Sequence, residues 1–230
     1  THGQYNAAYA TMVENLDRNI GLLLSKLKEK DHFKHTLIVF TSDNGGLYGI
    51  TQQKPLRAGK GSYYEGGIRE PFFFVWKDKI QPSTKNDVPI TNLDLFPTLL
   101  EAAGINYGKG LLDGDNLLPI LSGSKKQLER ELYWHFPIYL QAYNPEDNEN
   151  RDALFRTRPG SLIRDGDWKL HYYFEDKEME LYNLKHDIGE RDNLVVERPE
   201  KAKELLDQLK IWWESTDAPI PSNLNSDYEE

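Results

Sequence analysis

The feature that most constrains the fold is a short apolar run that ends abruptly in polar residues. The residues from Leu37 to Phe40 are all apolar, and Asp43, Asn44 and two glycines follow shortly after them. A continuous apolar run is typical of a strand that is covered on both faces, as in a parallel sheet. Ligands of open α/β sheets bind beyond the carboxyl ends of the strands. The run therefore predicts an α/β fold with a candidate ligand site at its end.

The residues around this strand also indicate α/β structure. Apolar positions recur every three or four residues from Tyr9 to Leu27, which predicts one apolar stripe on a helix. The segment 71–76 is a second candidate for a buried strand. A short helix is expected between Pro97, near its start, and Gly104, just past its end. These elements lie within roughly the first 110 residues, which is enough chain for one α/β layer structure.

The second half of the chain has a different pattern. We expect strands over 130–136 and 178–184, and a hairpin whose turn is Asp165-Gly166. A last helix begins at Pro199, with Trp212 and Trp213 as anchors to the core. This order predicts an antiparallel sheet with one helix.

A loop-like stretch over 111–127 is the expected boundary between the two patterns. We predict that 1–122 belong to a large α/β domain and that 123–230 form a small α+β subdomain. The 230 residues contain no cysteine, which excludes disulfides and a cysteine nucleophile within them. The net charge of −9 argues against nucleic acid as a partner. No apolar run approaches the length of a membrane span, so membrane insertion is not expected.

The residues at the end of the first strand have two interpretations. The oxygens of Asp43 and Asn44 are hard ligands that suit Ca²⁺ or Mg²⁺. The alternative is an ordinary turn, because Asp, Asn and Gly all favour turns. Both interpretations stay open on this peptide alone.

A glycine-rich loop follows, and it contains several basic residues. Lys60 lies between two glycines, and a flexible ammonium group there is well suited to hold an anionic oxygen. The alternative is a solvated lysine in a mobile loop. Glu65 and Arg69 are four positions apart and are spaced to pair with each other, which would brace the loop.

At this point the sequence resembles the second half of the formylglycine-dependent sulfatases, members of the alkaline-phosphatase-like superfamily. The segment that combines the lysine with EGGIR and a proline is the specific part of the likeness. The likeness covers nearly the whole chain in the order of the family. It is carried by YATMVENLDRNIGLLLSKL, TLIVFTSDNGG, KPLRAGKGSYYEGGIREP, DLFPTLLEAAGI, LDGDNLLPILSG, RELYWHFP, LIRDGDWKLHYYF and ELYNLKHDIGERDNL.

The resemblance implies a role for particular residues. Asp43 and Asn44 would be two ligands of one Ca²⁺, and Lys60 would contact the sulfate. The fold would be the C-terminal part of an alkaline-phosphatase-like mixed sheet with flanking helices, followed by a small antiparallel sheet and a C-terminal helix. The complete polypeptide would hydrolyse sulfate esters of small molecules or glycans. A periplasmic, secreted or lysosomal location would follow from the family.

One part of the family's machinery is missing from this sequence. The nucleophile is a formylglycine made within a Cys/Ser-x-Pro-x-Arg motif, and no such motif occurs here. We therefore expect the formylglycine and the other calcium ligands in an upstream part of the same polypeptide, which would be this chain's partner. The chain alone would be inactive. His2 lies close to the place of a second active-site histidine, but its spacing to the helix is too short for an assignment.

Three further features have competing interpretations. His135 is a candidate for the sugar or aryl subsite, and the alternative is a histidine held in place at a strand end. His171 is expected on an exposed face of the hairpin. The polar loop over 143–160, with Arg156 and Arg158, is a place for substrate specificity or an insertion without function.

Two other functions compete with sulfate-ester hydrolysis. A phosphatase or phosphodiesterase of the same superfamily would use two metal ions. Asn44 disfavours this reading, because a neutral amide is a poor ligand for a second Zn²⁺. A non-catalytic binding module would explain the missing nucleophile. Aryl, glycan and glycosaminoglycan sulfates all remain open as substrates.

Overall fold

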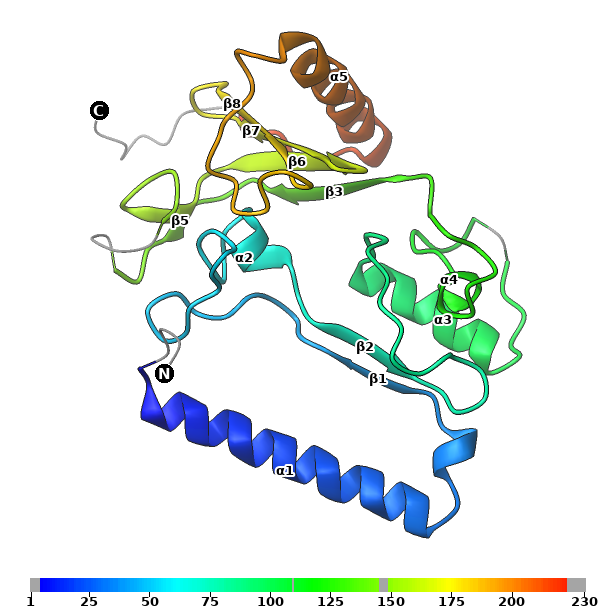
Figure 1. Ribbon diagram of the computed structural model, residues 1–230. Coiled ribbons are helices and arrows are strands. Elements are labelled where there is room, and N and C mark those ends of the chain that lie inside the picture. The colour runs from blue at the N-terminus through cyan, green and yellow to red at the C-terminus, as the bar shows by residue number, and fades with distance from the viewer. Residues whose placement is uncertain (1–4, 109, 145–148, 223–230) are drawn as a thin grey trace. The chain divides into compact units, whose positions relative to one another are not determined.

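The computed structural model describes residues 5–108, 110–144 and 149–222, and its described parts fall into two compact units (Figure 1). Of the described residues, unit 1 combines Asn44–Arg69 with those of 130–222 and with Tyr5 and Asn6. Unit 2 combines Ala7–Asp43 with Glu70–Glu129. The glycine-rich segment therefore groups with the second half of the chain, although it lies between two strands of the first half. The expected division after residue 122 stays a prediction.

Unit 2 contains the helix and strands that were predicted around the apolar run. Strands β1 and β2 form a two-stranded sheet in which Thr41 lies opposite Phe72. They run antiparallel, although the continuous apolar run of β1 is typical of a strand in a parallel sheet. The elements of unit 2 are α1 (Ala7–Glu29), η1 (Phe33–His35), β1 (Ile38–Thr41), β2 (Phe72–Val75), η2 (Asn92–Asp94), α3 (Leu95–Ala102) and α4 (Leu118–Leu121).

The local signals of unit 2 explain these elements. Helix α3 ends before Gly104, which has a φ of 69° and so adopts the left-handed conformation that favours glycine. The stretch expected to be loop-like contains the short helix α4, which begins with Leu118 and Pro119. Helix α1 forms as predicted, but it buries none of its residues.

Unit 1 contains the predicted antiparallel sheet and last helix. The strands lie in the order β3-β6-β7-β8, and every neighbouring pair is antiparallel. The hairpin between β6 and β7 turns at Gly166, whose φ is 56°. The small sheet of β4 and β5 was not anticipated. The elements are α2 (Glu65–Ile68), β3 (Glu131–Phe136), β4 (Leu140–Gln141), β5 (Phe155–Thr157), β6 (Gly160–Asp165), β7 (Trp168–Tyr173), β8 (Met179–Asn183) and α5 (Pro199–Thr216).

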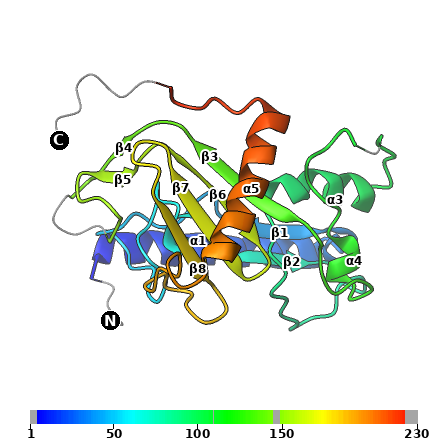
Figure 2. The same cartoon turned by 90° about the horizontal axis from the view of Figure 1, so that it is seen from above.

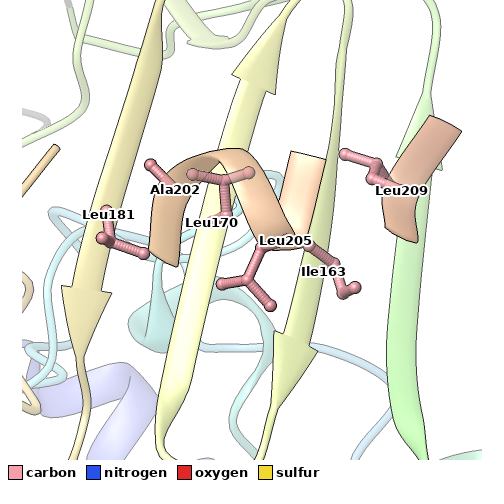
Figure 3. Close-up of a cluster of buried hydrophobic side chains, with 6 residues drawn as sticks. All are labelled: Ile163, Leu170, Leu181, Ala202, Leu205 and Leu209. Atoms are coloured by element: carbon pink, nitrogen blue, oxygen red, sulfur yellow. The ribbon is translucent and has the colours of Figure 1, made fainter. Parts of the chain in front are cut away.

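The core of unit 1 lies between α5 and one face of the four-stranded sheet (Figure 2). Leu205 and Leu209 are fully buried against side chains of β6, β7 and β8 (Figure 3). Burying one such leucine contributes about 1.5–3 kcal/mol, so this face is the main apolar support of the unit. Trp212 and Trp213 pack against the same cluster, which confirms their predicted role. Among the described helices, none is long and apolar enough to cross a membrane.

Candidate functional site

The glycine-rich segment of unit 1 is folded tightly upon itself. The N–H of Gly45 donates to the carbonyl of Gly67 at 2.9 Å, and Gly66 donates to the carbonyl of Arg57 at 2.9 Å. A Cβ atom on Gly45 would lie 1.9 Å from the carbonyl oxygen of Gly66. Since that distance is far inside van der Waals contact, only glycine allows these two parts of the backbone to approach so closely.

Lys60 is held by its backbone, while its side chain extends into solvent. Its N–H donates to the carbonyl of Gly46 at 3.0 Å, which ties it to the segment that follows Asn44. The amide nitrogen of Asn44 donates to the carbonyl of Gly45 at 3.0 Å. Lys60 is exposed, and its ammonium group has no hydrogen bond or ion pair with the part of the chain that is described. Unit 1 therefore brings Asn44 and Lys60 into one hydrogen-bonded segment.

Asp43 ends the unit 2 segment, where it lies near a carboxylate that sequence reasoning missed. Burial and the charge of Asp43 raise the pKa of Glu70 to about 7, although a hydrogen bond from Ser42 opposes the shift. One carboxylate oxygen of Glu70, Oε1, is buried and has no hydrogen-bond partner among the described residues. The pairing of β1 with β2 explains why Glu70 lies near Asp43, because residues that follow β1 lie opposite residues that precede β2.

A cation beside Asp43 fits this arrangement, because it would relieve the repulsion between two neighbouring carboxylates. The oxygens of Asp43 and Asn44 are donors of the kind that Ca²⁺ prefers. Within the described ranges, no group of three or more His, Cys, Asp or Glu side chains is arranged to hold a metal ion.

The loop that carries Lys60 is anchored to the sheet by a buried cluster of charges. The ammonium of Lys169 on β7 lies 3.0 Å from Glu65 Oε1 and 2.9 Å from Glu190 Oε1. All three side chains are at most 2% exposed. Glu190 Oε2 also accepts the backbone N–H of Glu65 at 2.5 Å, at the start of α2. Glu65 pairs with Arg69 at 3.1 Å, as predicted.

The buried carboxylates of this cluster stay ionised. Burial opposes the charged form of Glu190, but Lys169 and His171 more than offset it and lower its pKa to about 2. The pKa of Glu65 is also lowered, since Lys169 and Arg164 outweigh the effects of burial and of the Glu190 charge. The cluster is therefore an ionic tie between the glycine-rich segment and β7.

His171 does not lie on an exposed face, so that expectation is wrong. Its ring is fully buried, and Nε2 lies 3.3 Å from Glu190 Oε1. Successive side chains of a strand point to opposite faces, so Lys169 and His171 share one face while Leu170 faces α5. The alternation of polar and apolar residues suggested solvent on the polar face. In the structure, Tyr64 from the glycine-rich segment packs on the His171 ring, with centroids 5.1 Å apart.

His135 lies on β3 with both ring nitrogens hydrogen bonded. Nδ1 lies 2.6 Å from Ser161 Oγ, and Nε2 lies 3.1 Å from the carbonyl oxygen of Pro219. Burial lowers the pKa of His135, although the bond to Pro219 opposes the shift. Its ring also packs against Phe174 and Trp212. These contacts are those of a histidine held in place, and its part in substrate binding stays a prediction.

Comparisons with known proteins agree with the fold and with the order of these motifs. The sulfatase family profile matches residues 2–105. The profile of the C-terminal part of N-sulphoglucosamine sulphohydrolase matches residues 59–216. The fold and the strand-end segment thus define a mixed α/β protein of the sulfatase type. The chain belongs to the sulfatase family.

Individual relatives support the same family. A sulfatase of Formosa agariphila is 34% identical over 237 residues, covering 93% of this chain and 40% of the relative. Human arylsulfatase A is 29% identical over 225 residues, covering 85% of this chain and 40% of the relative. The chain therefore spans about 40% of the length of these curated relatives.

Solved structures are similar over nearly all of the chain. The crystal structure of Ps i-CgsB in complex with k-i-k-neocarrahexaose has a TM-score of 0.75 and 28% identity, over 96% of this chain and 46% of that one. The structure of BT4656 in complex with D-glucosamine-2-N,6-O-disulfate has a TM-score of 0.71 and 26% identity, over 92% of this chain and 41% of that one. Mixed α/β structure with small antiparallel sheets is thereby confirmed.

Proposed function

We propose that the complete polypeptide hydrolyses sulfate esters, and that this chain supplies part of its sulfate and calcium sites. The observation that carries the proposal is the contrast between the bonded backbone of Lys60 and its exposed ammonium group. Its backbone is fixed by a 3.0 Å bond to Gly46, while its ammonium group lacks a partner among the described residues. An unpaired ammonium on a fixed loop suits the binding of a sulfate oxygen.

Asp43 and Asn44 would hold one Ca²⁺ together with ligands from the upstream part of the polypeptide. The buried oxygen of Glu70 near Asp43, which has no partner in the described part of the chain, supports a cation at this place. When bound, Ca²⁺ would act as a Lewis acid that withdraws charge from a sulfate oxygen. The formylglycine nucleophile is also expected upstream, so this chain alone would be inactive.

Within this chain, the chemical role that we assign falls to Lys60. Negative charge moves onto the oxygens of the sulfuryl group and of the leaving group as the S–O bond breaks. An ammonium group that is carried by a fixed loop and lies close to a developing negative charge stabilises the transition state more than the ground state. The loop must therefore hold its position during the reaction. The tie between Glu65, Lys169 and Glu190 is suited to that task.

The proposed partners are a sulfated small molecule or glycan and the upstream part of the same polypeptide. Several apolar side chains of α1 are exposed, among them Met12 at 68% and Leu22 at 63%. Phe73 on β2 is 58% exposed. Exposed apolar side chains in such numbers mark surfaces that another segment covers. His135 is a candidate contact to the group that carries the sulfate. A periplasmic, secreted or lysosomal location is proposed from the family alone.

The test uses the natural full-length protein, matured with its formylglycine, and compares two esters as its substrates. Hydrolysis of 4-nitrophenyl sulfate and of 4-nitrophenyl phosphate is followed side by side, with and without a calcium chelator. We expect sulfate release that depends on calcium, with slow release of phosphate. Preferential release of phosphate would instead support a two-metal phosphatase and would refute our reading of Asn44.

A further inference from the structure

A shallow hollow in unit 1 lies beside Lys60 and contains a second cation. It encloses about 270 Å³ of empty space, including part that is open to solvent. The residues that line it include Lys60, Arg156 and Tyr143. Tyr48, Asn144 and Asn150 also line it. The described lining therefore holds two cations and no carboxylate.

Arg156 differs from the arginines near it in the chain. Arg151 pairs with Asp176 at 2.5 Å, and Arg158 pairs with Glu175 at 2.9 Å. In the part of the chain that is described, Arg156 has no carboxylate partner. This is unusual in a chain in which 37 acidic residues outnumber 28 basic ones.

The guanidinium of Arg156 is nevertheless held in place. Its Nε donates to the carbonyl of Gln141 at 2.9 Å, and Nη1 lies 3.4 Å from the carbonyl oxygen of Lys60. Its Cζ lies 3.8 Å from the centre of the Tyr143 ring. These contacts orient the group and use two of its five N–H donors, so donors remain for a ligand. An oriented guanidinium without a carboxylate partner suits a carboxylate or a sulfate group.

Glu149, which adjoins the lining residue Asn150 in the sequence, does not neutralise this hollow. Glu149 pairs with Arg191 at 2.6 Å, and a hydrogen bond from Tyr48 also helps to lower its pKa, although burial opposes the shift. Its charge is thus engaged by groups other than Arg156. Among the described residues, no carboxylate pairs with Lys60 or Arg156, so their positive charge is available to an anionic ligand.

We propose that this hollow binds a second anionic group of the substrate, a sulfate or a carboxylate on a saccharide ring that carries or adjoins the ester being cleaved. The inference rests on the proposed function, because Lys60 is taken to hold the reacting sulfate. Tyr143 offers an aromatic face to the sugar ring, and the two asparagine amides suit its hydroxyl groups. Saccharides with two anionic groups would therefore be preferred to those with one.

The test measures this preference with the full-length, matured protein. Wild type, Arg156→Gln and Arg156→Lys are assayed on a disulfated disaccharide and on its monosulfated counterpart. We expect Arg156→Gln to lower the ratio of the two kcat/KM values about tenfold, mainly through KM of the disulfated substrate, since a charge-assisted contact is lost. Arg156→Lys keeps the positive charge but lacks the planar set of N–H donors of a guanidinium. Its kcat/KM ratio should therefore lie between those of the wild type and Arg156→Gln. Arg18→Gln, at a position of α1 that lies off its apolar stripe, is the control and should change kcat/KM for neither substrate.

The ratio separates recognition from a merely structural role. If Arg156 only supports the backbone of Lys60, both substrates lose activity equally and an unchanged ratio overturns the proposal. If the wild type hydrolyses neither disaccharide, the 4-nitrophenyl sulfate assay still tests the proposed function, and calorimetric binding of the disulfated disaccharide tests the hollow by itself. Binding that is about tenfold weaker to Arg156→Gln would then support the site. Equal binding, or no binding, would overturn it.

Discussion

Replacing Lys169 with methionine tests the ionic tie beneath the glycine-rich segment. The ammonium makes contacts of 3.0 and 2.9 Å to two buried carboxylates and is itself fully buried. Methionine has nearly the same length but no charge, so it would leave Glu65 and Glu190 facing each other in the interior. Removing one partner of a buried ion pair typically costs about 3–5 kcal/mol. Glu65 keeps Arg69 at 3.1 Å, so most of the cost should arise at Glu190.

The assay is urea unfolding of the full-length protein, followed by tryptophan fluorescence. Trp168 lies next to Lys169, and Trp213 lies in the same unit, so the signal reports on this region. We expect Lys169→Met to reduce the free energy of unfolding by about 3–5 kcal/mol. Lys201→Met is the matched control, because its pairs with Asp165 and Glu204 are partly exposed and should contribute about 1 kcal/mol or less. A loss of less than about 1 kcal/mol for Lys169→Met would refute the reasoning.

Three further predictions concern charge and calcium. The folded pKa of Glu190, about 2, lies below its ordinary value of 4.5, so its stabilising effect is present above pH 4.5 and is lost as pH falls toward 2. Urea unfolding at pH 5.5, 4.5 and 3.5 should show that the free energy of unfolding falls less steeply with decreasing pH for Glu190→Gln than for the wild type. An equally steep fall for both proteins would contradict the low pKa of Glu190. Lys60→Ala in the full-length enzyme should lower kcat about 100-fold or more with little change in KM, and unchanged turnover would remove Lys60 from the mechanism. This chain alone should bind Ca²⁺ weakly, so micromolar affinity by calorimetry would show a more complete site.

Much of the secondary structure could be predicted because its signals are local. The apolar stripe from Tyr9 to Leu27 specifies α1, and the Asp165-Gly166 turn specifies the hairpin of β6 and β7. Each signal lies within a few turns of a helix or two adjacent strands, where the chain's own geometry decides the outcome. The direction of β2 against β1 was not predictable in this way, since 30 residues separate Thr41, the end of β1, from Phe72, the start of β2.

The candidate site was predictable only in its residue types. Asp43, Asn44 and Lys60 stand out because oxygen ligands and a lysine among glycines have recognisable chemistry, whatever their surroundings. Glu70 did not stand out, because its significance depends on the strand register that places it near Asp43. The same holds for Arg156, whose importance lies in the absence of a carboxylate partner among the described residues.

The sequence by itself determined the helices, the hairpin and the chemical character of the residues that follow β1. Only the tertiary structure decided which polar residues are buried. Lys169 and His171 alternate with apolar neighbours as solvent-facing residues do, yet the glycine-rich segment covers them. The contact between Glu65 and Lys169 joins positions 104 residues apart. Pairings of this kind depend on how distant segments pack, and no local pattern of residues encodes them.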